Sequence, residues 1–186
     1  VSRRFVKATA HNLARMFERA LTGEEIVAVF IDGKRFAENG VIIALGVRLD
    51  GTKLVLGFIE SGRENHRVCG DFIRRLVDRG LRVDDGVLFV IDGSKGLYKG
   101  IKDAVGANGF VQRCQWHKRE NVLQYLDKKH QEHFRFKLQQ AYEEPTYEKA
   151  KARLMAVRRE LSLVNESAVA SLDEGLEETL TLHNLG

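Results

Sequence analysis

Two aspartates, each followed by a glycine, are the residues of this chain whose surroundings first suggest chemistry. Asp32 follows the apolar run 26–31, and Asp92 follows the apolar run 86–91. Neither run shows the polar alternation of a half-buried strand, and such a run is typical of a strand buried on both faces. An acidic side chain directly after a strand of this kind needs a structural or a chemical reason.

Two interpretations fit the Asp-Gly pairs. Asp-Gly is a strong turn signal, and Asp50-Gly51, which separates the β-type runs 40–49 and 52–60, predicts a hairpin turn. Asp92 is instead followed by a helical pattern that ends near residue 106. If the strands before Asp32 and Asp92 are neighbours in a mixed sheet, the two carboxylates meet beyond the strand ends. The pattern alone allows either a set of separate turns or one shared site.

A shared site would bind a metal. Two carboxylates held close together repel each other, and they resist ionising unless a divalent cation lies between them. In metal-dependent phosphoryl transfer, two ions about 3.5–4 Å apart bind the attacking and the leaving oxygen. The shared-site interpretation therefore predicts Mg²⁺ or Mn²⁺ bound by Asp32 and Asp92.

The elements around these residues belong to an α/β protein. A helical pattern over 6–21 precedes three β-type runs, a helix over about 65–80, the run 86–91, a second helix and a strand at 110–114. From His117 onward only helical spacing remains. One predicted helix extends to Pro145, a second follows the seam 150–164, and a third covers 172–180.

Composition sets wide limits on function. The chain has 186 residues, of which 44% are hydrophobic, with a net charge of +4 and a pI near 9.1. This balance is compatible with a polyanionic partner without requiring one. Two cysteines are too few for a disulfide framework, which indicates a protein of the reducing cytosol. No apolar stretch is long enough for a membrane span. The start at Val1 and the stop at Gly186 suggest a fragment of a longer protein.

The stretch "CQWH" has a Cys-x-x-His spacing formed by Cys114 and His117. A structural zinc site needs about four ligands, and the other candidates, Cys69 and His66, lack a matching spacing, so zinc is disfavoured. The simpler interpretation makes Cys114 a small buried residue and His117 a helix-start cap or a satisfied polar contact. Trp116 is either a core residue or a platform on which a displaced base stacks.

The amino-acid sequences of several segments, taken together, are more specific than any single motif. The segments "FIDGKRF", "ESGRENHRVCGDFIRRLVDRGL", "LFVIDGSKGLYKGI", "VQRCQWHKRENVLQYL" and "LDEGLEETLTL" closely resemble the Mutator-type transposases of bacterial insertion sequences, and the similarity runs from Val1 to Gly186. The element order is that of a ribonuclease H-like fold. The resemblance implies a ribonuclease H-like mixed β-sheet flanked by helices at 1–118, followed by an all-helical insertion at 119–186.

This family consists of DDE transposases, which cut DNA at element ends and join the freed 3′-hydroxyl to target DNA. The resemblance makes Asp32 the first catalytic aspartate and Asp92 the second. The third acid, a Glu, follows the insertion in this family, so it is expected beyond Gly186, and the fragment alone is expected to be inactive. Nothing in the family pattern supports Glu120 as a substitute. The opening "VSRRF" resembles the tail of a helix-turn-helix.

The resemblance also implies roles for residues near the two acids. A Cys/Asp-x-x-His signature accompanies the acidic site in this family, so His117 is expected to contact the scissile phosphate or to support a carboxylate. The predicted DNA contacts are Lys34, Arg35, Lys95, Lys99 and Trp116, although solvated surface charge explains any single lysine or arginine equally well. The expected partners are element ends, target DNA and further copies of the chain, in the bacterial cytoplasm and at the nucleoid.

Two other functions fit the same residues. A ribonuclease H-like nuclease would hydrolyse DNA without joining it to a target. A non-catalytic DNA-binding or assembly module would use the helical block for protein contacts.

Overall fold

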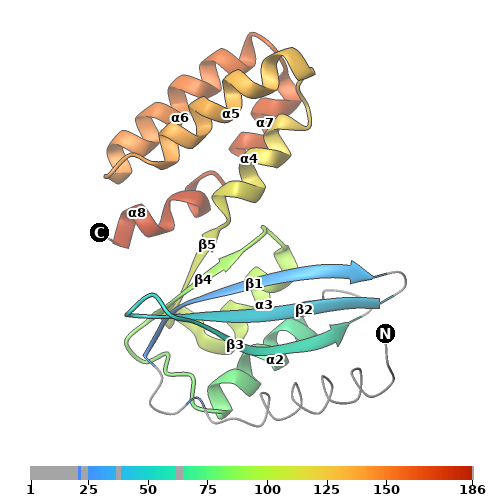
Figure 1. The fold of residues 1–186 in the computed structure, drawn as a ribbon, viewed down its shortest axis with the longest axis vertical. Helices are drawn as coiled ribbons and strands as arrows, with labels where there is room; N and C mark the ends of the chain where they lie inside the picture. Colours follow the sequence, from blue (N-terminus) through green and yellow to red (C-terminus); the bar gives the residue numbers. More distant parts are fainter. Residues whose placement is uncertain (1–20, 22–24, 37–38, 62–64, 186) are drawn as a thin grey trace. The chain divides into compact units, whose positions relative to one another are not determined.

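The computed structural model describes residues 21, 25–36, 39–61 and 65–185 (Figure 1). The helix predicted over 6–21 and the "VSRRF" opening lie outside these residues, except for Leu21, which is buried. By its internal contacts the chain divides into two compact units, Val1–Phe110 and Val111–Gly186. Among the described residues no helix is long and apolar enough to cross a membrane.

A mixed five-stranded sheet confirms the predicted α/β class. Its strands are β1 (Ile26–Phe36), β2 (Asn39–Arg48), β3 (Lys53–Ser61), β4 (Val87–Ile91) and β5 (Gly109–Arg113). Their order in the sheet is β3-β2-β1-β4-β5. β2 pairs with β1 and with β3 in antiparallel fashion, whereas β4 runs parallel to β1.

The predicted hairpin at Asp50-Gly51 is confirmed, with a loop longer than two residues. β2 ends at Arg48 and β3 begins at Lys53, so four residues make the connection. The backbone N–H of Thr52 donates to Asp50 Oδ1 at 2.8 Å. Hydrogen bonding from the Thr52 side chain, and next from its backbone, holds the pKa of Asp50 below its usual range. Gly51 has a φ of 82°, a conformation that glycine adopts at no steric cost.

Two helices, α2 (His66–Asp78) and α3 (Lys95–Val105), pack side by side against one face of the sheet (Figure 1). Their backbones approach closely at two glycines. A Cβ added at Gly100 would lie 2.7 Å from Cys69 Cβ and 2.8 Å from the backbone nitrogen of Gly70. Glycine at this point therefore sets the distance between the two helices.

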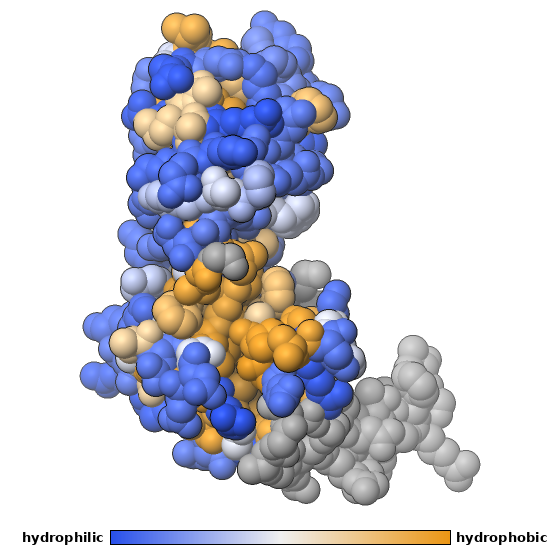
Figure 2. Space-filling model, turned by 90° about the vertical axis from the view of Figure 1, so that its left-hand side faces the viewer, coloured by the Kyte–Doolittle hydropathy of each residue, from blue (hydrophilic) through white to orange (hydrophobic). Residues whose placement is uncertain are grey.

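The two faces of the sheet differ in burial. Val29, Ile31 and Ile42 belong to the core, whereas Phe30 and Ile43 are 44% and 40% exposed. The prediction that the run 26–31 is buried on both faces is therefore wrong for β1, because both described helices of this unit cover the same face. Figure 2 shows hydrophobic residues gathered on the surface of the sheet-bearing unit. We call the face that carries Phe30 and Ile43 the open face.

The second unit is helical after β5. It contains α4 (Gln115–Leu123), α5 (Lys128–Tyr142), α6 (Tyr147–Ser162), α7 (Glu166–Asp173), a 3₁₀ turn η2 (Glu177–Leu180) and α8 (Thr181–Leu185). Its core is built from leucines at helical spacing with a few smaller or aromatic residues; its central members are Val122, Phe134, Leu138, Ala141, Leu154, Leu161, Leu172 and Leu180.

Two predicted helices are divided in the structure. The helix expected up to Pro145 consists of α4 and α5, and the Gln131 side chain donates to the carbonyls of Leu123 and Leu126 at the break. These bonds satisfy carbonyls that a continuous helix would have used. The helix expected over 172–180 is interrupted at Gly175, which has a φ of 68°.

Candidate functional site

Asp32 and Asp92 occupy neighbouring positions on adjacent strands. The parallel pairing of β1 with β4 runs from Ala28↔Leu88 to Ile31↔Ile91. The next residue along the chain is an aspartate in both cases: Asp32 within β1 and Asp92 directly after β4. Because parallel strands advance together, this register makes Asp32 and Asp92 neighbours across the pairing.

The turn interpretation is wrong for Asp32. β1 does not end there, as the sequence suggested, but continues to Phe36. Asp32 is paired with Ile43 of the antiparallel neighbour β2, and Gly33 is paired with Ile42. Asp32 therefore lies within a strand, and its side chain is exposed.

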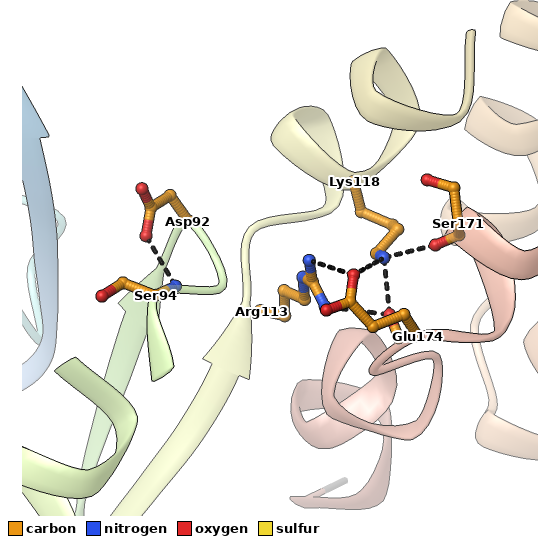
Figure 3. Close-up of polar contacts among 6 residues, drawn as sticks. All are labelled: Asp92, Ser94, Arg113, Lys118, Ser171 and Glu174. Atoms are coloured by element: carbon orange, nitrogen blue, oxygen red, sulfur yellow. Dashed lines mark hydrogen bonds and ion pairs between the residues drawn. The ribbon is translucent and has the colours of Figure 1, made fainter. Parts of the chain in front are cut away.

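Asp92, in contrast, combines a turn with its place beside Asp32. Its Oδ1 accepts a hydrogen bond from the backbone N–H of Ser94 at 3.0 Å (Figure 3). Gly93 has a φ of 105°, and the Ser94 side chain caps α3 by accepting from the Leu97 N–H. The turn occupies one carboxylate oxygen of a half-buried side chain.

The register places Asp32 on the open face. Residues directly opposite each other in an antiparallel pair point to the same side of a sheet, and alternate residues of one strand do so as well. Asp32 is opposite Ile43, which is opposite Phe58, and Phe30 lies two residues earlier on β1. The acid thus borders an exposed apolar surface.

Two of the predicted basic residues lie close after Asp92. Lys95 and Lys99 are exposed, and their four-residue spacing in α3 puts them on one side of the helix. Lys102 has a structural role, because its Nζ donates to the Gly109 carbonyl at 2.7 Å. The side chains of Lys34 and Arg35 lie outside the described part of the chain.

The Cys-x-x-His segment forms the junction between β5 and α4. Cys114 is the N-cap residue of α4 and makes no side-chain capping bond. Trp116 is 58% exposed, which excludes it as a core residue, and its ring lies edge-on to the His117 ring with 4.9 Å between centroids. His117 Nδ1 is buried and has no hydrogen-bond partner among the described residues.

A buried cationic cluster next to this segment was missed by the sequence analysis. The side chains of Arg113 and Lys118 are 8% and 0% exposed, and both face the carboxylate of Glu174, at 3.3 Å and 3.8 Å (Figure 3). Burial lowers the pKa of Lys118 to about 8, with a further contribution from Arg113, while Glu174 opposes the shift. Nothing in the sequence indicates that Lys118 is buried, because its neighbours along the chain, His117 and Arg119, are polar.

Glu120 forms ion pairs with arginines, and the family pattern does not support it as a third acid. Its carboxylate contacts Arg135 and also Arg119, the latter at 3.2 Å. The hydrogen bond from Arg135 is the main reason why the pKa of Glu120 lies below its usual range.

The candidate metal donors of the sheet unit are the two aspartates. Mg²⁺ and Mn²⁺ prefer oxygen ligands, and carboxylates are ligands of this kind. Within the described ranges no group of three or more His, Cys, Asp or Glu side chains could hold a metal ion.

Comparison with known proteins assigns the family. Residues 5–185 match the family model described as "Transposase, Mutator family", which is nearly the whole chain. The chain belongs to the Mutator family of transposases. The resemblance found from the sequence is thereby confirmed.

Curated relatives of this Mutator-family chain are transposases of insertion sequences. The transposase of element ISRM5 from Rhizobium meliloti is 33% identical over 148 residues, which cover 79% of this chain and 36% of that protein. The transposase of element IS6120 from Mycolicibacterium smegmatis is 27% identical over 177 residues, covering 91% and 54%. The match to the transposase of IS256 in Tn4001 from Staphylococcus aureus is 32% identical and covers half of this chain. The chain spans about a third to a half of the length of the first two relatives.

Proposed function

We propose that this chain is the first part of the catalytic core of a DDE transposase with a ribonuclease H-like fold. Asp32 and Asp92 bind Mg²⁺ or Mn²⁺, and the chain acts in cleavage and transfer of DNA strands at insertion-sequence ends. The observation that carries the proposal is the register Ile31↔Ile91, because it makes the two acids neighbours although 59 residues separate them in sequence. Membership of the transposase family supports the choice of DNA as substrate.

The bound ion supplies the electrophilic chemistry of phosphoryl transfer, activating the attacking oxygen and stabilising the leaving one. The residues of this chain hold it in place. Asp32 is fixed by its pairing with Ile43 of β2 and directly follows the last residue that pairs with β4, and the Asp92 carboxylate is oriented by its hydrogen bond from Ser94. Such preorganisation keeps ligand geometry constant through the reaction.

The third acid of the site is proposed to come from the parent protein beyond residue 186. Two carboxylates leave a catalytic metal site incompletely liganded, and the relatives are considerably longer than this chain. The open face beside Asp32 offers an apolar surface on which such a segment can pack. The fragment alone is accordingly proposed to be inactive, with a catalytic part at 1–118 and an insertion at 119–186.

DNA is proposed to contact exposed residues near the acids. Lys95 and Lys99 bind backbone phosphates, together with Lys34 and Arg35, which follow Asp32 in sequence. Trp116 stacks on an unpaired base, since it is exposed and aromatic. His117 contacts the scissile phosphate or a metal-bound carboxylate. Several copies act together in the active complex, in the bacterial cytoplasm.

Replacement of Asp92 by Asn in the full-length parent protein tests this function. Asn keeps an Oδ1 that accepts from the Ser94 N–H, so the turn is preserved while the metal ligand is lost. We expect Asp92→Asn to abolish cleavage and joining of labelled element ends in Mg²⁺ or Mn²⁺. Asp50→Asn, the same change at the hairpin Asp-Gly, is the matched control and should retain full activity. Normal strand joining by Asp92→Asn would refute the proposal.

The joining assay also separates the two alternative functions. A nuclease would give cut ends without transfer of the 3′-hydroxyl into target DNA. A non-catalytic module would bind DNA equally well in EDTA and give neither product.

A further inference from the structure

Residues 111–118, which contain the Cys-x-x-His segment, are tied to residues 171–182 of the same unit. We call the latter the C-terminal clamp. The Thr181 hydroxyl donates to the Val111 carbonyl at 2.7 Å, and the amides of Gln112 and Gln115 both donate to the Thr179 carbonyl, at 2.6 Å and 2.9 Å. Gln112 also accepts from the Leu182 N–H. These bonds join segments more than 60 residues apart.

The strongest ties are made by the two buried cations. Lys118 Nζ donates to the carbonyls of Ser171 and Glu174, each at 2.5 Å, at the end of α7 (Figure 3). A guanidinium nitrogen of Arg113 donates to the same Glu174 carbonyl at 2.9 Å. A positive charge at a helix C-terminus is favoured by the helix dipole and by its unpaired carbonyls.

The backbone of the clamp is shaped to admit these cations. Gly175 follows Glu174 with a φ of 68°, and a Cβ at this position would lie 2.6 Å from an Arg113 guanidinium nitrogen. Glycine suits this position for two reasons: it adopts the left-handed backbone at no steric cost, and a Cβ here would force the Arg113 guanidinium to shift.

The residues that the clamp does not hold are the ones that could act on DNA. Val111, Gln112, Arg113, Gln115 and Lys118 all bond to the clamp. Of the same eight residues, Cys114 makes no side-chain capping bond, His117 Nδ1 has no hydrogen-bond partner in the part of the chain that the structure describes, and Trp116 is exposed. Residues 111–118 thus contain one group that is hydrogen-bonded to the clamp and a second group whose side chains take no part in these bonds.

We propose that the C-terminal clamp fixes the β5–α4 junction so that Trp116 and His117 are presented to DNA in one orientation, with Arg113 and Lys118 as positioning residues. The role given to Trp116 and His117 rests on the proposed function, whereas the clamp itself does not. A rigid platform loses little conformational entropy when a base or a phosphate binds to it. Arg113 and Lys118 are buried, so their positioning role does not require that they contact DNA themselves.

Trp116 is the sole tryptophan of the chain, so its fluorescence reports on the junction alone. Time-resolved anisotropy of the DNA-free protein measures how freely the indole moves on the nanosecond scale. We expect the amplitude of the fast component to increase at least about twofold in Lys118→Met and in Gly175→Ala, because side-chain motion of a released residue falls in this time range. Gln115→Ala removes one neutral hydrogen bond from a half-buried side chain and provides a milder variant that keeps both cations.

Lys137→Met is the matched control. It removes a lysine that pairs with Glu160 between α5 and α6, without touching the clamp. It should lower the melting temperature and leave the Trp116 anisotropy decay unchanged. If the three clamp variants have helical circular dichroism and a wild-type anisotropy decay, or if Lys137→Met changes the decay equally, the positioning role is refuted. An unfolded Lys118→Met leaves Gly175→Ala and Gln115→Ala to decide by the same criterion.

A single-stranded oligonucleotide distinguishes failure of the clamp from failure of the proposed function. Stacking of a base on Trp116 should quench its fluorescence in the wild type and less strongly in the clamp variants. Increased mobility in the variants without quenching in any protein would support the clamp and remove Trp116 from DNA binding. Quenching in the wild type with unchanged mobility in the variants would support the DNA contact and overturn the clamp.

Discussion

At the scale of single residues, Asp32, Asp92 and Lys118 show how far sequence reasoning extends. The adjacency of the two aspartates was predictable, because both follow apolar runs and parallel strands share an edge. The continuation of β1 beyond Asp32 was not, since Gly33 and Lys34 have the composition of a turn. The burial of Lys118 depends on carbonyls of Ser171 and Glu174, more than 50 residues away, and no local pattern contains that information.

Lys118 gives a prediction about pH. Its pKa is about 8 in the folded protein, below the ordinary value of 10.5. Between these two values the unfolded chain binds a proton that the folded chain does not, so this group adds stability as the pH rises. The gain approaches about 3 kcal/mol once the pH exceeds both values.

Urea unfolding at pH 7 and pH 10 measures this effect. The free energy of unfolding of the wild type should rise relative to that of Lys118→Met over this range, because all other titrations are common to both proteins. Lys137→Met should follow the wild type. Parallel pH profiles for the wild type and Lys118→Met would show that Lys118 is not the group responsible.

At the scale of elements, the strands and the hairpin were predictable from apolar runs and turn residues, whereas two helix breaks were not. Leu126 continues the apolar spacing across the division between α4 and α5, and the cause of the break is a side chain of the next helix, Gln131. Gly175, whose backbone has a φ of 68°, interrupts another helix beside the Arg113 side chain. Hydrophobic periodicity records neither break.

The packing of α2 on α3 predicts a large cost for Gly100→Ala. The added Cβ would meet the Gly70 backbone nitrogen at 2.8 Å and the His66 carbonyl oxygen at 3.0 Å, and neither can rotate away. We expect a loss of about 3 kcal/mol in the free energy of unfolding, at the upper end for overpacked sites. Asp103→Ala, at an exposed position of the same helix, should change it by less than about 0.5 kcal/mol. A loss of similar size in both variants would contradict the close contact at Gly100.

At the scale of the whole molecule, charge is distributed unevenly. Residues 111–186 contain twelve basic and twelve acidic side chains, so the net charge of +4 belongs to residues 1–110. In the helical unit many charges are paired, as in Arg158–Asp173, Lys151–Glu177 and Arg153–Glu144. Electrostatic attraction of DNA is therefore expected from the sheet-bearing unit.

The salt dependence of DNA binding tests this distribution. In Lys95→Gln/Lys99→Gln the slope of log K against log salt should decrease by about 1.8, since each phosphate contact contributes about 0.9. Lys128→Gln/Lys129→Gln, a pair of equally exposed lysines at the start of α5, is the matched control and should leave the slope unchanged. Equal effects of both double variants would show that the lysines act only through net charge.

The most direct test of the central claim is metal-directed cleavage of the full-length parent protein by Fe²⁺ bound in place of Mg²⁺. With ascorbate and peroxide, a bound Fe²⁺ generates radicals that cut the backbone nearest to it. One ion shared by Asp32 and Asp92 predicts two cuts, one near each residue, both suppressed by excess Mg²⁺ and both lost in Asp32→Asn as well as in Asp92→Asn, while Asp50→Asn retains them. Independent cuts, each lost only with its own aspartate, or no cut at either position would contradict a shared metal site.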